Sequence, residues 1–137
     1  MIVRNNNLLK QYRLAGNCEW CGKHCVRREP AHVVSRGIGG SDIAINLVAL
    51  GSSNESESAS CRCHSLSHAG QSPTRAELLE LVAQREGFTV EAIEDVIAFF
   101  RNLDKYASCW MIDEQLREMS ETARMLALRE LAEAGIP

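Results

Sequence analysis

Three of the chain's four histidines fall within one window, among residue types that bind metals or move protons. His32 ends a short apolar run, and Asn46 lies inside the next one. His64 and His68 are four residues apart, so on a helix they share one face and can bind one ion through two imidazoles. A neutral imidazole at position 32 can take a proton from water at physiological pH. The spacing of His64 and His68 predicts a metal site, and the chemistry of imidazole makes His32 a candidate proton acceptor beside it.

Each of these residues also has a plainer interpretation. His32 could be a structural histidine or a zinc ligand. Asn46 could orient His32 by bonding to its backbone, or it could make a local turn bond or cap. Histidines at the spacing of His64 and His68 also occur by chance on protein surfaces. Arg36 follows His32 by four residues and could hold a phosphate oxygen, or it could be an ordinary surface arginine.

The cysteines around this window predict a second, structural metal site. Cys18 and Cys21 form a C-x2-C knuckle, which supplies two of the four ligands that a tetrahedral zinc ion requires. We expect the other two to be Cys61 and Cys63, although their C-x-C spacing is tighter than usual.

Several alternatives remain for these thiols. Cys25 or His24 could replace Cys61 as a ligand. Without a metal, the cysteines would be free thiols. The polar N-terminus lacks the pattern of a secretory signal, so six cysteines favour a reducing compartment and metal binding over disulfides.

Charge is distributed unevenly along the chain. The net charge is −3 overall, but residues 1–75 carry nine Lys or Arg against five Asp or Glu, and residues 76–137 carry six against thirteen. The basic half coincides with the histidine window and can contact phosphates, while the acidic half limits unspecific binding. No apolar run approaches the roughly 20 residues that span a bilayer. The glycine-rich loop 37–40 lacks the Lys-Ser/Thr pair of a P-loop, which argues against nucleotide binding.

The sequence predicts short elements first and helices later. In the first half we expect a helix over 5–15, strands at 33–34 and 43–50 joined by the loop 37–42, a Ser/Glu-rich loop over 51–60, and a helix over 63–69. In the second half Ser72-Pro73 predicts a helix start. Helices are expected over 76–85, 90–104 and 112–134, the last with an apolar stripe that could be a dimer face.

Residues from about 14 to 70 resemble the HNH endonuclease family, of the phage and bacterial type with zinc-binding cysteine pairs. The resemblance rests on CEWC at 18–21, AHVVSRGIGGSD at 31–42, INLVAL at 45–50 and CHSLSH at 63–68. It implies a ββα-metal (His-Me finger) fold, in which two antiparallel strands, a loop and a helix surround one divalent ion. It also implies His32 as the general base, Asn46 as the residue that positions it, and His64 and His68 as the metal ligands.

Two features depart from the family pattern. Ala31 stands where many members carry a metal-binding Asp or His, so that water or a nearby acid such as Glu29 would complete the shell. The segment 51–60 is inserted where a zinc cysteine would often follow the second strand directly. Helices after about residue 72 have no counterpart in the resemblance.

Together these observations predict an α+β protein, with a zinc-stabilised ββα-metal domain over 1–71 and a helical extension over 72–137. The expected function is a metal-dependent DNA endonuclease with a structural zinc and a catalytic Mg²⁺, Mn²⁺, Ni²⁺ or Zn²⁺. The alternative is a non-catalytic zinc module that binds DNA or protein through a degenerate site. We expect DNA as the partner, no membrane association, a possible homodimer through the C-terminal helices, and the cytoplasm of a bacterial or phage-infected cell.

Overall fold

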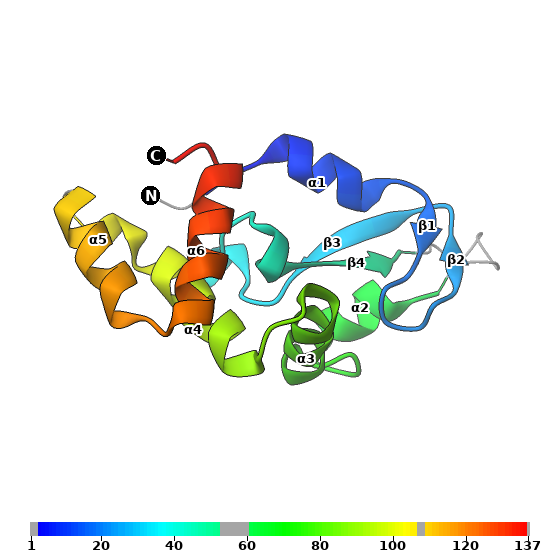
Figure 1. Cartoon of the computed structure of the whole chain (residues 1–137). Helices are drawn as coiled ribbons and strands as arrows, with labels where there is room; N and C mark the ends of the chain where they lie inside the picture. The colour runs from blue at the N-terminus through cyan, green and yellow to red at the C-terminus, as the bar shows by residue number, and fades with distance from the viewer. Residues whose placement is uncertain (1–2, 53–60, 107–108, 137) are drawn as a thin grey trace.

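A hairpin of two antiparallel strands lies at the centre of the N-terminal half of the computed structural model, which describes residues 3–52, 61–106 and 109–136 (Figure 1). β3 (Arg28–His32) pairs with β4 (Leu47–Gly51), from Arg28 opposite Gly51 to His32 opposite Leu47. Helix α1 (Asn6–Arg13) lies on one side of this hairpin, and α2 (Cys63–His68) and α3 (Arg75–Glu86) lie on the other. All five residues of β4 are buried, because helices cover both of its faces.

A smaller hairpin carries the cysteine knuckle at one end of the molecule. β1 (Gly16–Asn17) pairs with β2 (His24–Cys25), and the loop between them contains Cys18 and Cys21. The knuckle is fastened to β4 through Glu19, whose backbone N–H donates to the Ala49 carbonyl at 2.9 Å. The Glu19 carboxylate in turn accepts from the Ala49 backbone N–H at 2.5 Å.

The central strands differ in position from those predicted. The first one ends at His32 instead of covering residues 33–34, and the first part of the predicted strand 43–50 is a 3-10 turn, η2 (Ala44–Asn46). A second 3-10 turn, η1 (Arg36–Ile38), lies in the connecting segment. The β-branched pair at 33–34 is buried because it packs into the core, not because it pairs with β4. Of the predicted loop 51–60, residues 53–60 lie outside the described residues.

The helices of the second half are capped largely as the sequence indicates. α3 begins after a capping box of Thr74 and Glu77, so the predicted start at Ser72-Pro73 is two residues early. It ends at Gly87, whose φ of +75° suits a residue without a side chain. α4 (Val90–Arg101) is capped by Thr89, as expected, and is followed by the short turn η3 (Leu103–Lys105).

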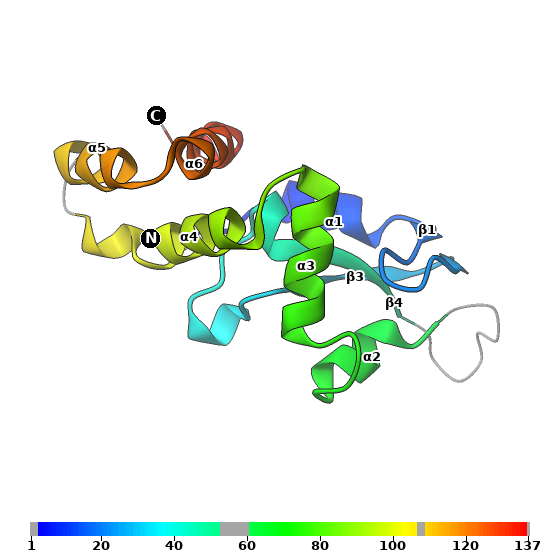
Figure 2. The same cartoon turned by 60° about the horizontal axis from the view of Figure 1, so that its bottom comes forward.

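The predicted helix over 112–134 is wrong, because two helices occupy this segment. They are α5 (Cys109–Glu118) and α6 (Glu121–Glu133), and the Ser120 hydroxyl accepts from the Ala123 N–H to cap the second. The Arg124 guanidinium donates to the carbonyls of Leu116, Arg117 and Met119, which satisfies the free end of α5. α6 packs against α4, and α5 lies far from α2 in both views (Figures 1 and 2).

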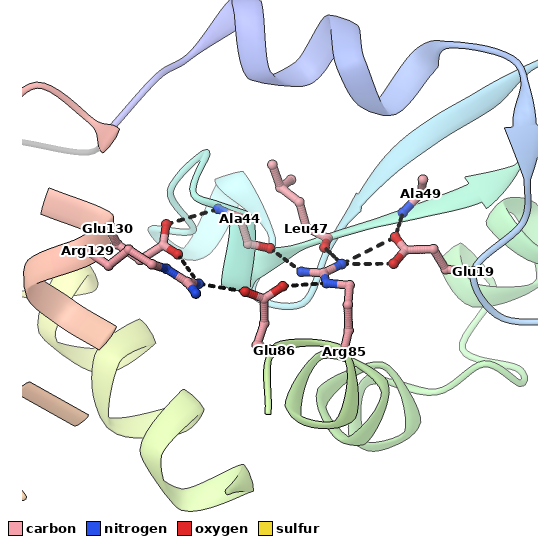
Figure 3. Close-up of polar contacts among 8 residues, drawn as sticks. All are labelled: Glu19, Ala44, Leu47, Ala49, Arg85, Glu86, Arg129 and Glu130. Carbon is pink, nitrogen blue, oxygen red and sulfur yellow. Dashed lines mark hydrogen bonds and ion pairs between the residues drawn. The ribbon is translucent and has the colours of Figure 1, made fainter. Parts of the chain in front are cut away.

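An ionic network joins the knuckle, the central strands and the C-terminal helix (Figure 3). Arg85 of α3 pairs with Glu19 at 3.0 Å and with Glu86 at 2.8 Å, and it also donates to the carbonyls of Ala44 (2.6 Å) and Leu47 (2.9 Å). From α6, Arg129 bonds Glu86 at 2.6 Å, and the buried Glu130 accepts from the Ala44 N–H at 3.3 Å. The network therefore clamps the backbone on both sides of Asn46.

One hydrophobic cluster runs through the molecule, from Val3 at the N-terminus to Leu131 on α6. Residues of β4, α3, α4 and α6 all contribute to it.

The protein is a small α+β structure, with two small antiparallel sheets and six α-helices among the described residues. The division at residue 71 stays a prediction. None of the helices in the described ranges is long and apolar enough for a bilayer crossing.

Candidate functional site: a cysteine cluster beside a histidine-lined cavity

Four cysteines meet where the knuckle touches the start of α2. The sulfur atoms of Cys18, Cys21, Cys61 and Cys63 all lie within 4.8 Å of one another. Four thiolates at about 2.3 Å from a tetrahedral zinc ion would lie about 3.8 Å apart, so the cluster has the size of such a site. Four cysteines in this arrangement can hold a metal ion.

The alternative ligands are placed differently. His24 is exposed on β2, where it pairs with Asn17, and it does not join the cluster. Cys25 is fully buried beside the cluster, with its sulfur 3.7 Å from that of Cys61. The mutual distances therefore favour Cys61 as the fourth ligand and leave Cys25 immediately behind it.

Burial favours the neutral thiol at two of the four cysteines, Cys61 and Cys63. Burial raises the pKa of Cys61 to about 12, with the neighbouring sulfurs of Cys21 and Cys18 adding to the effect. Burial also raises the pKa of Cys63. Burial opposes ionisation of Cys18 as well, but backbone hydrogen bonds around its sulfur outweigh it and lower the pKa. A cation entering the cluster would displace the remaining thiol protons.

The three histidines of the sequence window line one cavity of about 420 Å³. His32 contributes from the end of β3, and His64 and His68 contribute from α2. Arg36 lies on the same wall as His32, and Arg75 enters from the first turn of α3. The cavity therefore combines three imidazoles with two guanidinium groups.

His64 and His68 are close enough to share one ion. Their Nε2 atoms are 3.2 Å apart, and two nitrogens at about 2.0–2.1 Å from a tetrahedral cation would be separated by about 3.3 Å. Burial lowers the pKa of His64, and the neighbouring His68 lowers it further. Both effects favour the neutral imidazole that a metal requires. Because α2 begins at Cys63, the cysteine cluster also fixes the position of both histidines.

Asn46 fastens the loop beyond His32 instead of bonding His32 itself. Its side-chain oxygen accepts from the Val34 N–H at 2.8 Å, and its amide donates to the carbonyls of Val34 (3.0 Å) and Ser41 (2.9 Å). In place of the expected bond to the His32 backbone, the Asn46 side chain bonds Val34, two residues further on, and Ser41, at the end of the loop. Asn46 is buried and holds the shape of the segment that leaves β3.

Asp42 is a site residue that the sequence analysis missed. Its Oδ1 lies 2.8 Å from His32 Nε2, and its Oδ2 accepts from Arg36 at 2.9 Å. An Asp at the end of a glycine-rich loop looks like a turn residue, so nothing local marked it. Arg36, expected to face phosphate, is therefore paired with Asp42, although its side chain is still 46% exposed.

Arg75, another residue that lines this cavity, was also missed by the sequence analysis. Arg75 follows the Thr74 cap and gave no signal beyond a helix start. Glu29, suggested as a further metal ligand, pairs with Arg13 at 3.3 Å, and its charge also acts on His64, so its role as a ligand stays a prediction. Ala31 is buried in β3 opposite Val48 and adds no ligand.

No family model, curated protein or solved structure matches this chain. The arrangement offers an imidazole held by a carboxylate, an imidazole pair for one cation, and two arginines, of which Arg36 is also paired with Asp42. A phosphodiester with an attacking water is a substrate that uses all three.

Proposed function

We propose that the protein is a metal-dependent endonuclease that hydrolyses DNA phosphodiester bonds. The observation that carries this proposal is the shared cavity of His32, His64 and His68, with Arg36 and Arg75 on its walls. The resemblance to HNH endonucleases assigns the same three histidines to the reaction. A strand pair followed by a helix, as in β3, β4 and α2, is also the element order of the ββα-metal fold.

Two metal positions follow from the donor sets. Cys18, Cys21, Cys61 and Cys63 would hold a structural zinc, because thiolates are ligands that zinc prefers. His64 and His68 would hold the catalytic cation, with water in the remaining positions. That cation, when bound, stabilises the negative charge that develops on the phosphate. It can be Mg²⁺, Mn²⁺, Ni²⁺ or Zn²⁺.

The chain's own residues perform the remaining steps. His32 accepts a proton from water, whose oxygen forms a bond to phosphorus while the bond to the leaving oxygen breaks. The leaving oxygen takes its proton from solvent. Arg75 and the exposed part of Arg36 bind the phosphate oxygens, and the net positive charge of residues 1–75 attracts the DNA backbone.

A plasmid nicking assay with Mg²⁺, Mn²⁺, Ni²⁺ or Zn²⁺ tests the proposal. A general base contributes about 10²–10⁴ in rate, so His32→Ala should lose cleavage by that factor and keep its fold. His24→Ala is the matched control, because His24 is exposed on β2 and does not line the cavity. Cleavage by His32→Ala at the wild-type rate would show that His32 is not the base.

The second candidate function is a zinc module that binds DNA without cutting it. The buried Ala31 favours it, because it leaves the cavity with two histidine ligands. In that case no metal would support nicking by the wild-type protein. Binding of a DNA duplex would still weaken with salt, as phosphate contacts require, and Arg75→Ala would reduce the slope by about one.

A further inference from the structure

We propose that Asp42 is the positioning residue of His32: its buried carboxylate holds Nε2 and leaves Nδ1 as the nitrogen that takes the proton. The role of this pair in catalysis rests on the proposed endonuclease function, whereas the contact between Asp42 and His32 does not. The resemblance to known endonucleases gave this role to Asn46. Here Asn46 bonds Val34 and Ser41, and Asp42 contacts the imidazole.

The Asp42 carboxylate is held firmly from several sides. It is 1% exposed, and its Oδ1 lies 2.8 Å from His32 Nε2. Its Oδ2 accepts from Arg36 at 2.9 Å and from the Asn5 backbone N–H at 3.0 Å. Arg4 approaches Oδ1 at 3.8 Å, and the Asp42 N–H donates to the Val3 carbonyl at 2.9 Å. The carboxylate therefore cannot turn away from the imidazole without breaking other bonds.

These contacts determine which nitrogen of His32 carries the hydrogen. Burial alone would raise the pKa of Asp42, but the hydrogen bonds from His32, Asn5 and Arg36 outweigh it and lower the pKa. An ionised carboxylate only accepts hydrogen bonds, so His32 donates through Nε2. In a neutral imidazole the lone pair is then on Nδ1. His32 lines the cavity and Asp42 occupies its Nε2, which leaves Nδ1 as the nitrogen for an attacking water.

The charges around His32 make the pair testable by titration. Asp42 favours the protonated imidazole, whereas Arg36, Arg75 and Arg4, together with any charge on His64 and His68, disfavour it. Replacing Asp42 with Asn removes the favourable charge and leaves the arginines in place. Protonation of His32 should then need a lower pH.

Nitrogen-15 NMR of histidine-labelled protein tests the pair without any cleavage. The chain has four histidines, and His32→Gln identifies the signal of interest. We expect wild-type His32 to carry its hydrogen on Nε2, and Asp42→Asn to lower its titration midpoint by about one pH unit. His24 is the internal control and should not move. The assignment would be overturned if neutral His32 in the wild-type protein carried its hydrogen on Nδ1, a result that needs no variant. It would also be overturned if Asp42→Asn left the titration midpoint of His32 unchanged.

A pH–rate profile of plasmid nicking then tests what the pair does. Asp42→Asn should cut at least about tenfold more slowly and move the acidic limb of the profile to lower pH. Combined with His32→Ala, Asp42→Asn should cause no further loss, because it acts through that imidazole. Asp95→Asn, an exposed aspartate on α4, is the matched control.

The two proposals fail in distinguishable ways. Asp42→Asn could cut more slowly while the acidic limb of the profile stays in place, or it could cause a further loss when combined with His32→Ala. Either result would show that Asp42 has only a structural role, in which it bonds residues 3–5 to the loop. Absence of nicking by the wild-type protein would refute the endonuclease. The NMR titration would still decide whether Asp42 holds His32.

Discussion

Gly51 ends β4 directly against the cysteine cluster, and replacing it with alanine should damage the metal site. A Cβ at this position would overlap the Cys61 sulfur and lie 2.6 Å from the Cys25 sulfur. Non-bonded contacts need about 3.5–4.0 Å, so the two sulfurs would have to move by roughly 1–2 Å, the Cys61 sulfur by more than the Cys25 sulfur. Metal–sulfur distances tolerate only about 0.2 Å, so Cys61 would leave the ligand set.

The expected loss of zinc affinity can be worked out from the contribution of one ligand among four. Structural zinc sites contribute about 10–16 kcal/mol, so losing one of four thiolates costs about 2.5–4 kcal/mol, or roughly 10²–10³ in zinc affinity. Gly37→Ala is the matched control, because a Cβ there meets nothing within 4 Å. It should bind zinc like the wild-type protein.

Competition between the protein and a chelator for zinc, with zinc per chain from elemental analysis, measures this change. Circular dichroism should also show that chelation unfolds the N-terminal part of the wild-type protein before the helices of the second half. Wild-type zinc affinity in Gly51→Ala would refute the packing argument. A protein that carries no zinc and melts at the same temperature with and without chelator would refute the metal site itself.

The remaining predictions concern buried polar groups. Glu130→Ala leaves the Ala44 N–H without its acceptor and removes one partner of Arg129. It should lower the free energy of unfolding, measured in urea, by about 2–4 kcal/mol. Glu133→Ala, at an exposed position on the same helix, should lower it little. Asn46→Ala removes three buried hydrogen bonds and should cost a similar amount, with slower plasmid nicking if the loop beyond His32 shifts. Because the pKa of Asp42 is lowered in the folded protein, its stabilising contribution should be complete above its ordinary value of 3.8 and decline as the pH falls below it. Stability that stays constant through this acidic range would contradict the ionised Asp42.

Local patterns predicted most of the helices. Thr89 and Gly87 mark ends that the structure also has, because capping depends on residues within one turn. The prediction of one long helix over 112–134 was wrong for a related reason. The apolar stripe continues on both sides of Ser120, although this residue caps a new helix. The side chain that closes the break, Arg124, acts across five to eight positions and is not visible in the stripe.

The position of the central strands could not be read from residue type. Val33 and Val34 have the branched side chains typical of strands, but the pairing partner of β4 is the segment Arg28–His32, which includes Pro30. Pairing is a choice between segments far apart in the chain, and β propensity follows burial as much as backbone preference.

The sequence by itself determined the chemical groups: a C-x2-C knuckle, a histidine pair one helical turn apart, and a histidine and an asparagine at the edges of apolar runs. These depend on spacings within a turn or a strand. Tertiary structure alone decided between the ligand alternatives and brought in groups that no motif marked. Cys61 joins the cluster beside Cys25, and Asp42 and Arg75 enter the histidine site. The Ala44 N–H finds its acceptor 86 residues away, on Glu130. Such contacts depend on how the whole chain packs around one core, which no local pattern contains.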